Sequence, residues 1–223
     1  MYKNKIIAVV IPAHNEALLI QKTLAAVPDY IDFIAVIDDA STDTTWLKIE
    51  ESAKKDSRIK TLKHEKNSGA GASVATGFEW CINQKIDIVA CMDGDGQMAP
   101  ADLPALLDPV VEGRADFSKG NRLITGDAYR IMPKIRYFGN SILSLLTKVA
   151  SGYWHIADSQ SGYTAINKKA LHLIDWDKMY KRYGQPNDLL VRLNIYNLKV
   201  RDVQINPVYG VGEKSGIKLR KII

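Results

Sequence analysis

The feature that most constrains this chain is the repeated alternation of short apolar runs with segments of helical spacing. The apolar runs are IIAVVIPA, FIAVIDDAS, IKTLKHE and DIVACMD, and the segments between them are ALLIQKTLAAV, TTWLKIEESAKK and NSGAGASVATGFEWCIN. Nearly continuous apolar strands that alternate with helices are typical of a mostly parallel sheet with helices on both faces. The sequence therefore predicts an α/β fold.

Size and composition fit one such unit. The chain has 223 residues, of which 46% are hydrophobic, and this is enough for one large domain or two tightly fused halves. No internal repeat or low-complexity linker divides the sequence. The formal charge of +5 and the pI near 9.0 admit nucleic acid, an anionic membrane surface or a phosphate-rich substrate as partners, without choosing among them.

No segment predicts a membrane span or a secretory leader. The first apolar run is too short for the core of a signal peptide. The stretch SILSLLTKVASGYW is interrupted by polar residues and falls short of the ~20 apolar residues that a span needs. Cys81 and Cys91 lack the spacing of a zinc site or a disulfide framework, and they predict two buried thiols in a reducing cytoplasm.

Polar residues gather where the predicted strands end. The first run ends in PAHNE, the second in DDAS and the fourth in DGDGQ. In sheets of this kind, ligands bind at the carboxyl ends of the strands. We therefore expect the three polar clusters to converge on one edge of the sheet and to form a site.

Asp93 and Asp95 carry the clearest chemical signal. Two carboxylates at a strand end, separated by one small residue, can reach the same hard cation, and Gly94 and Gly96 let backbone and ligand approach closely. Such a cation needs an oxygen-rich partner, and a diphosphate is the natural one. The EF-hand pattern is not met, because Gln97 stands where that loop needs a carboxylate. The remaining alternative is a solvated Asp-Gly turn.

The stretch NSGAGASVATG gives a weaker signal. Its glycines open a predicted helix, but Val74 stands where the third glycine of a dinucleotide-binding G-x-G-x-x-G belongs, and no P-loop Lys-Ser/Thr pair follows. The stretch predicts a tight turn and close helix packing, with backbone N–H groups that can face an anion.

Taken together, the motifs resemble a known family. In order along the chain, VVIPAHNE, VIDDASTDTT, KNSGAGASVATGF, CMDGDGQMAP, GNR and DSQSGYTAI are similar to the inverting family 2 glycosyltransferases of the GT-A fold. They are most similar to the dolichol-phosphate mannose and polyprenyl-phosphate sugar synthase branch. The likeness runs from about Ile6 to Pro207. It implies a single GT-A domain over residues 1–223, with a nucleotide-sugar-binding half at about 1–122 and an acceptor-binding half at about 123–223.

The resemblance implies two sets of donor-site residues. The nucleotide-sugar-binding set is Pro12, His14, Glu16, Asp38, Asp39, Gly69, Asp93 and Gly94. The metal set is Asp93, Asp95 and Gln97, at the D-x-D motif that binds Mg²⁺ or Mn²⁺ on the donor diphosphate. Asp39 matches the residue that binds the base edge, whereas Asp38 is expected to hold the loop. Gly94 stands where relatives more often carry alanine.

Four residues are the catalytic candidates. Arg122 and Arg136 match basic positions of the branch, where positive charge neutralises the departing diphosphate. Asp188 fits a general base for a hydroxyl acceptor, and it fits equally a helix cap or the partner of an arginine. Asp158 matches a position near the acceptor, and the alternative is a carboxylate that anchors a loop. A lipid monophosphate acceptor is already ionised and needs no base.

The segment 135–153 bears on the acceptor. Apolar residues recur in it at helical spacing and predict an amphipathic helix. Together with the basic end KSGIKLRKII, this helix can lie on an anionic membrane and present a polyprenyl phosphate, or it can pack on the sheet. We expect a cytoplasmic protein on the inner face of the membrane, with no nucleic-acid partner.

The leading function is metal-dependent transfer of a hexose from GDP-mannose or a UDP-hexose to a polyprenyl or dolichyl phosphate. A saccharide hydroxyl in cell-surface polysaccharide synthesis is the alternative acceptor. A nucleotidyltransferase needs a glycine-rich basic first loop, where PAHNE is acidic and free of glycine. The intact pair of Asp93 and Asp95 argues against a noncatalytic nucleotide-sugar-binding protein.

Overall fold

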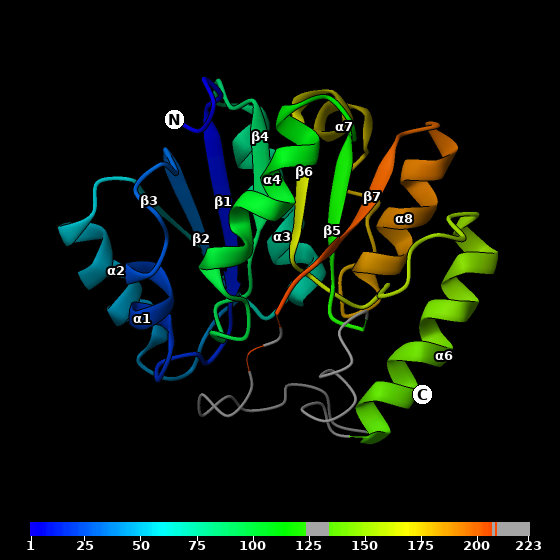
Figure 1. Cartoon of the computed structure of the whole chain (residues 1–223). Coiled ribbons are helices and arrows are strands. Elements are labelled where there is room, and N and C mark those ends of the chain that lie inside the picture. The colour runs from blue at the N-terminus through cyan, green and yellow to red at the C-terminus, as the bar shows by residue number, and fades with distance from the viewer. Residues whose placement is uncertain (124–133, 207, 209–223) are drawn as a thin grey trace.

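One mixed sheet confirms the predicted architecture (Figure 1). The computed structural model describes residues 1–123, 134–206 and 208, and of residues 134–137 it describes the backbone alone. Within these ranges the strand order is β3-β2-β1-β4-β6-β5-β7. The strands are β1 (Ile7–Ala13), β2 (Phe33–Asp38), β3 (Ile59–Lys63), β4 (Ile88–Cys91), β5 (Phe117–Asn121), β6 (Thr164–Asn167) and β7 (Val200–Gln204). Neighbouring strands are parallel except at β6, which runs antiparallel to both β4 and β5.

Helices cover both faces of this sheet. They are α1 (Ile20–Ala25), α2 (Thr45–Lys55), α3 (Ala70–Ile82), α4 (Leu103–Val111), α6 (Lys134–Ser151), α7 (Lys168–Leu173) and α8 (Gln185–Ile195), with a 3-10 turn η1 (Pro100–Asp102) before α4. Side chains of α3, α7 and α8 form one core with the sheet, and those of α1, α2 and α4 form the other. The predicted three-layer arrangement is therefore confirmed.

The central strand shows why the apolar runs are nearly continuous. Every residue of β1 is buried. Because successive side chains point to opposite faces, Ile7, Val9 and Ile11 enter one core while Ala8 and Val10 enter the other. A strand with helices on both sides has no position left for a solvated side chain.

The glycine-rich stretch serves close packing, as predicted. At Gly77 an added Cβ would lie 2.8 Å from Cδ1 of Ile37 and closer still to Val10, so the glycine lets α3 approach β1 and β2. Gly69, at the N-cap of α3, has a φ of 101°, a value that side chains rarely permit. Cys81 in α3 and Cys91 in β4 are both buried free thiols, which confirms the prediction of two buried thiols.

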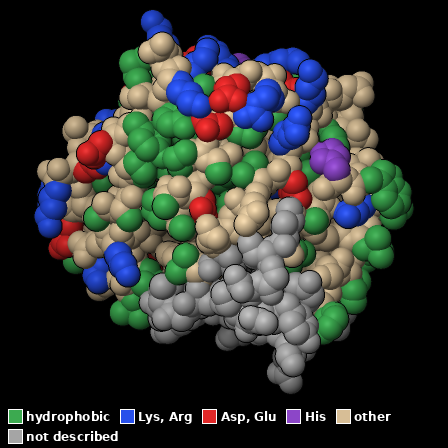
Figure 2. Space-filling view, in the orientation of Figure 1, with side chains coloured by type: hydrophobic (Ala, Val, Ile, Leu, Met, Phe, Trp, Pro, Cys, Tyr) green, Lys and Arg blue, Asp and Glu red, His purple; other side chains and the backbone are tan. Residues whose placement is uncertain are grey.

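Helix α6 is amphipathic as predicted, but its apolar face points outward. Six of its described large apolar side chains are between 42% and 65% exposed, and they are Phe138, Ile142, Leu143, Leu145, Leu146 and Val149. Among the described side chains of α6, residues 138–151, the buried ones are Ser144, Thr147 and Ser151. Figure 2 shows hydrophobic side chains along the edge of the molecule that α6 forms. The alternative in which this apolar face packs on the sheet is wrong. In the described ranges no helix has the length and apolar character to cross a bilayer.

Candidate active site

The polar clusters meet at the carboxyl ends of β1, β2 and β4, as predicted. The backbone N–H of Asp39 donates to the carbonyl oxygen of Ala13 at 2.8 Å, which joins the end of β2 to the end of β1. The N–H of Gly94 donates to the carbonyl of Pro12 at 3.2 Å, which joins the loop after β4 to the same place. In Figure 1 this edge lies at the lower side of the sheet.

The loops after β1 and β2 hold each other in place. Asn15 has a φ of 58°, and its backbone N–H donates to Oγ of Ser41 at 2.9 Å while its Oδ1 accepts from the N–H of Thr42 at 2.8 Å. The Nδ1 atom of His14 lies 2.8 Å from the carbonyl oxygen of Asp39. His14 itself is exposed, so a bound ligand can reach its ring.

Asp39 is surrounded by donors from the next part of the chain. Its Oδ1 accepts from the backbone N–H of Ser68 and lies 2.8 Å from Nδ1 of His64, and its Oδ2 accepts from the N–H of Gly69 at 2.8 Å. The other ring nitrogen of His64 lies 3.0 Å from Oγ1 of Thr76. The anion that faces the start of α3 is therefore the carboxylate of Asp39, where the helix dipole favours negative charge.

Asp38 holds the second loop. It is fully buried, and its Oδ2 accepts from the N–H of Ser41 at 3.2 Å. Its Oδ1 has no hydrogen-bond partner within the described part of the chain. The role of Asp39 at the base edge stays a prediction. A carboxylate oxygen can accept two hydrogen bonds, and Oδ2 of Asp39 receives one from Gly69.

Asp93 and Asp95 lie in a turn beyond the end of their strand. Because β4 ends at Cys91, the alternation of side chains along a strand does not position the pair, and local contacts do so instead. The Oδ1 of Asp95 accepts from the backbone N–H of Gln97 at 2.9 Å. The carbonyl of Gln97 in turn accepts from the N–H of Val208 at 3.3 Å. In these contacts Gln97 supplies backbone groups, and its side-chain role near a metal stays a prediction.

Glycines let this turn sit between two other segments. An added Cβ at Gly94 would lie 3.2 Å from the carbonyl oxygen of Pro12, and the carbonyl of Gly94 accepts from Oγ1 of Thr23. On the other side, an added Cβ at Gly162 would lie 3.3 Å from Oδ2 of Asp93. The carboxylate of Asp93 therefore lies directly against the loop that precedes β6.

The pKa of Glu16 indicates that negative charge gathers at this edge of the sheet. Burial raises the pKa of Glu16 to about 7, and the negative charges of Asp95, Asp93 and Asp43 add to the shift. These carboxylates are therefore near one another, and the potential between them favours a cation. The described residues contain no group of three or more His, Cys, Asp or Glu side chains that could hold a metal alone. Two carboxylates fit Mg²⁺ or Mn²⁺ when donor phosphates complete the ligand set.

Arg122 and Asp158 pair with each other. Nε and Nη2 of Arg122 donate to the two carboxylate oxygens of Asp158 at 2.7 and 3.1 Å, and the side chains are 15% and 0% exposed. Burial opposes ionisation, but the Arg122 guanidinium holds the pKa of Asp158 below its usual value. Asp158 also accepts from the N–H of Gln160, so it anchors its own loop. The side chain of Arg136 lies outside the described residues.

Asp188 stands in the first turn of α8. Its Oδ2 accepts from the backbone N–H of Tyr180 at 2.8 Å and from Nε of Arg192 at 3.0 Å. The predicted alternative of an arginine partner is thus observed. The role of a general base stays a prediction.

Sequence reasoning missed three residues of this region. His64 lies at the end of the third predicted strand, IKTLKHE, so the rule that ligands bind at the carboxyl ends of strands pointed to it. Lys119 is a charged residue between Ser118 and Gly120 in β5. Asn187 links separate segments, because its Oδ1 accepts from Oγ1 of Thr147 at 3.1 Å and from Nε2 of Gln160 at 2.8 Å. No local sequence pattern predicts this contact, because its partners lie 40 and 27 residues away in the chain.

A comparison with protein families identifies the family to which this chain belongs. The family model described as Glycosyl transferase family 2 matches residues 8–174, which include the loops after β1, β2 and β4 and the segment from Asp158 to Gly162. The chain belongs to this family. It is a glycosyltransferase.

Two relatives whose names refer to dolichyl or polyprenol phosphates are similar to this chain over most of their length. The UDP-N-acetylglucosamine–dolichyl-phosphate N-acetylglucosaminyltransferase of Methanococcus voltae is 29% identical over 92% of this chain and 87% of the relative. The polyprenol monophosphomannose synthase of Mycolicibacterium smegmatis is 30% identical over 96% and 82%. Among solved structures, glucosyl-3-phosphoglycerate synthase from Mycobacterium tuberculosis with Mg²⁺ and UDP superposes with a TM-score of 0.69 at 19% identity. The match covers 93% of this chain and 72% of that one. The predicted GT-A fold is therefore confirmed.

Proposed function

We propose that this family 2 glycosyltransferase moves a hexose from GDP-mannose or a UDP-hexose to a polyprenyl or dolichyl phosphate, with inversion at the sugar carbon. The names of the two relatives support a lipid-linked acceptor. In this proposal residues of about 1–122 bind the donor and residues of about 123–223 bind the acceptor. The protein works in the cytoplasm, on the inner face of the membrane.

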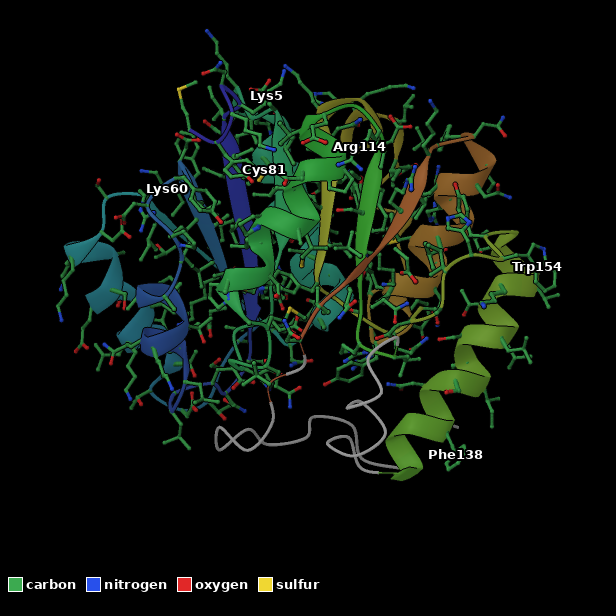
Figure 3. The ribbon with its side chains drawn as sticks, in the orientation of Figure 1. Lys5, Lys60, Cys81, Arg114, Phe138 and Trp154 are labelled. Carbon is green, nitrogen blue, oxygen red and sulfur yellow. The ribbon has the colours of Figure 1, made fainter. Side chains whose placement is uncertain are left out.

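The outward apolar face of α6 carries this proposal. Six large apolar side chains of one helix are exposed, and removing a side chain of this size from water is worth about 1.5–3 kcal/mol. Trp154, just past the helix, is 63% exposed, and tryptophan suits the boundary between lipid and water. Figure 3 shows Phe138 and Trp154 at the two ends of α6, on the outer side of the molecule. A bilayer would cover this face.

The inner side of α6 leads to the site. Oγ of Ser144 accepts from the backbone N–H of Ser159 at 3.0 Å, and Ser159 follows Asp158 directly. A helix that lies in the membrane surface would therefore hold a lipid phosphate beside the loop that touches Asp93. An ionised phosphate acceptor attacks without loss of a proton, so this chemistry needs no general base.

The donor diphosphate would lie at the carboxyl ends of β1, β2 and β4, near Asp93 and Asp95. Asp93 and Asp95 would hold Mg²⁺ or Mn²⁺ against the diphosphate oxygens. When bound, the cation supplies positive charge where the departing diphosphate gains negative charge. Arg122, oriented by Asp158, and Arg136 would add positive charge on the same side of the donor.

The release of nucleoside diphosphate tests the reaction. Purified protein is mixed with a panel of UDP-, GDP- and dTDP-sugars and Mn²⁺ or Mg²⁺, with and without polyprenyl phosphate. We expect release from one donor that rises with the lipid, stops with EDTA and falls at least ~10²-fold in Asp95→Asn. Asp29→Asn, an exposed carboxylate away from the site, is the matched control. Release that ignores both EDTA and the lipid would contradict the proposal.

Sedimentation with vesicles that contain anionic lipid tests the membrane contact. The double variant Leu146→Ser/Val149→Ser removes two side chains that are 61% and 65% exposed, so we expect much weaker vesicle binding and an unchanged Tm. The control is Leu47→Ser, 54% exposed on α2 at the far side of the sheet. Equal binding by wild type and the α6 variant would show that α6 does not dock on lipid.

A further inference from the structure

Lys119 is buried in the middle of the sheet. It lies in β5 and is 1% exposed, although lysine is almost never fully buried without partners. It shares a strand face with Phe117, which belongs to the core that α3, α7 and α8 cover. Its ammonium donates a hydrogen bond to the carbonyl oxygen of Ser161, in the loop before β6.

The charged groups that face Lys119 come from several elements. They are Asp158 in the loop before β6, Arg122 after β5 and Asp202 on β7, with the Cys91 thiol of β4 also facing it. Burial raises the pKa of Cys91 well above its usual range, so this thiol is neutral. The cluster therefore has two formally positive and two formally negative side chains.

Keeping an ammonium at this position costs folding free energy. Burial lowers the pKa of Lys119 to about 8, and Asp158 opposes part of this shift. An apolar side chain of similar length would fill the same space without that cost, since replacing buried charges by well-packed apolar groups is often neutral or stabilising. The lysine is thus better explained by what its ammonium holds than by packing.

What the ammonium holds is the loop at Asp93. Ser161 is followed by Gly162, and an added Cβ there would lie 3.3 Å from Oδ2 of Asp93. The hydroxyl of the next residue, Tyr163, donates to the carbonyl of Ala99 at 2.8 Å. Ala99 follows the turn that contains Asp93 and Asp95. The position of the Ser161 carbonyl therefore fixes the backbone that borders the Asp93 carboxylate.

We propose that Lys119 is a positioning residue of the donor site, which holds the Ser161 carbonyl so that Gly162 keeps the carboxylate of Asp93 in place for the cation. The inference rests on the proposed function, because it takes Asp93 as a metal ligand. Because its side chain is 1% exposed, Lys119 would act through this loop and would contact neither donor nor acceptor.

Binding of Mn²⁺ with UDP or GDP, followed by titration calorimetry, tests this without any acceptor. The variants are Lys119→Met and the double variant Lys119→Met/Asp202→Asn, which keeps the buried cluster neutral. Lys60→Met, an exposed lysine on β3, is the control. We expect the neutral double variant to fold with a Tm at or above that of wild type, and Lys119→Met alone to fold with a lower Tm because it leaves two buried carboxylates against one arginine. Both variants should bind Mn²⁺ with the nucleotide at least tenfold more weakly.

Each result has a distinct meaning. Wild-type affinity in the folded variants would overturn the role of Lys119 and leave the proposed function standing. Loss of folding in both the single and the double variant would also overturn it, because Lys119 would then be structural. Wild-type protein that binds no Mn²⁺ with either nucleotide would remove the proposed function itself, and the inference with it.

The pH dependence of Mn²⁺ and nucleotide binding distinguishes a positioning role of Lys119 from a purely structural one. Above a pH of about 8 the Lys119 ammonium loses its charge and its attraction for the Ser161 carbonyl weakens, so we expect affinity for Mn²⁺ and nucleotide to fall in wild type but not in the double variant. Stability has the opposite sign. The folded pKa of about 8 lies below the usual 10.5, so the unfolded chain holds more protons between these values, and wild type gains stability relative to Lys119→Met as the pH rises through this window.

Discussion

Two neighbouring helices, α6 and α8, are both rich in leucine and bury opposite kinds of residue. In α8 the buried side chains include Leu189, Leu190 and Leu193, each 3% exposed or less, and these leucines belong to the core under the sheet. In α6 Leu145 and Leu146 are 58% and 61% exposed, while small hydroxyl residues face inward. An amphipathic pattern thus defines an apolar face but does not say whether protein or another phase covers it.

The surface between the two helices explains how α6 keeps this orientation. The helices pack against each other, and the contact includes Oγ1 of Thr147 and Oδ1 of Asn187 at 3.1 Å. Polar groups that are buried must be paired, and here they pair with one another and with Gln160. Reversal of α6 would bury leucines but would leave these amide and hydroxyl groups without partners.

The largest expected effect is a matched pair of leucine substitutions. Leu193→Ala leaves a cavity in the core and should lower the free energy of unfolding by about 2–5 kcal/mol. Leu146→Ala removes a side chain already in water and should change it by less than about 0.5 kcal/mol, while vesicle binding weakens. Urea denaturation of both variants measures the difference. Equal losses would mean that the apolar face of α6 packs on protein in solution.

A smaller effect is expected at the contact between the helices. Thr147→Val keeps the shape of the side chain but removes its hydrogen bond to Asn187, so the free energy of unfolding should fall by about 1 kcal/mol. Ser52→Ala, which removes an intrahelical hydroxyl bond in α2, is the control for loss of a hydroxyl alone. A loss at Thr147 as large as that of Leu193→Ala would show that hydrogen bonding to Asn187 is not what holds α6.

The smallest expected effect is at Asp188, on the exposed side of α8. Asp188→Asn weakens a partly exposed pair with Arg192, worth about 0.3–0.5 kcal/mol. With a polyprenyl phosphate acceptor we expect turnover to fall less than about tenfold, because no general base is needed. Steady-state rates measure this. A fall of about a thousandfold would show that transfer depends on the Asp188 carboxylate and would contradict a mechanism without a general base.

The parts of the fold that depend on local pattern were predictable. β1, β2 and β4 are apolar runs next to helical segments, and the ligand-binding edge follows from their parallel direction. β6 was not predictable, because the four residues Thr164–Asn167 gain their place only by pairing antiparallel with two strands from elsewhere in the chain. β5 was not predictable either, because its sequence FSKGN is polar. Lys119 and Asn121 are buried only by contacts with residues far away in the chain.

The candidate site divides in the same way. The positions of Asp38, Asp39, Asp93 and Asp95 follow from adjacent strands. Their partners do not, because Asp39 binds Ser68 and Asp158 binds Arg122, which are 29 and 36 residues away in the chain. The sequence therefore predicted which side chains gather at this edge of the sheet. The hydrogen-bond donors that contact their carboxylates could be identified only from the tertiary structure.

The insertion of β6 between β4 and β5 also sets an order of assembly during synthesis. β1, β2, β3 and β4 emerge first and can pair at once, but the second edge of β4 (Ile88–Cys91) has no partner until Thr164 has been made. At about 5–20 residues per second, this leaves an apolar strand edge open for several seconds on the ribosome. Nascent chains that stop before β6 should therefore aggregate through β4, and those that extend past it should become soluble together with the closing of the sheet.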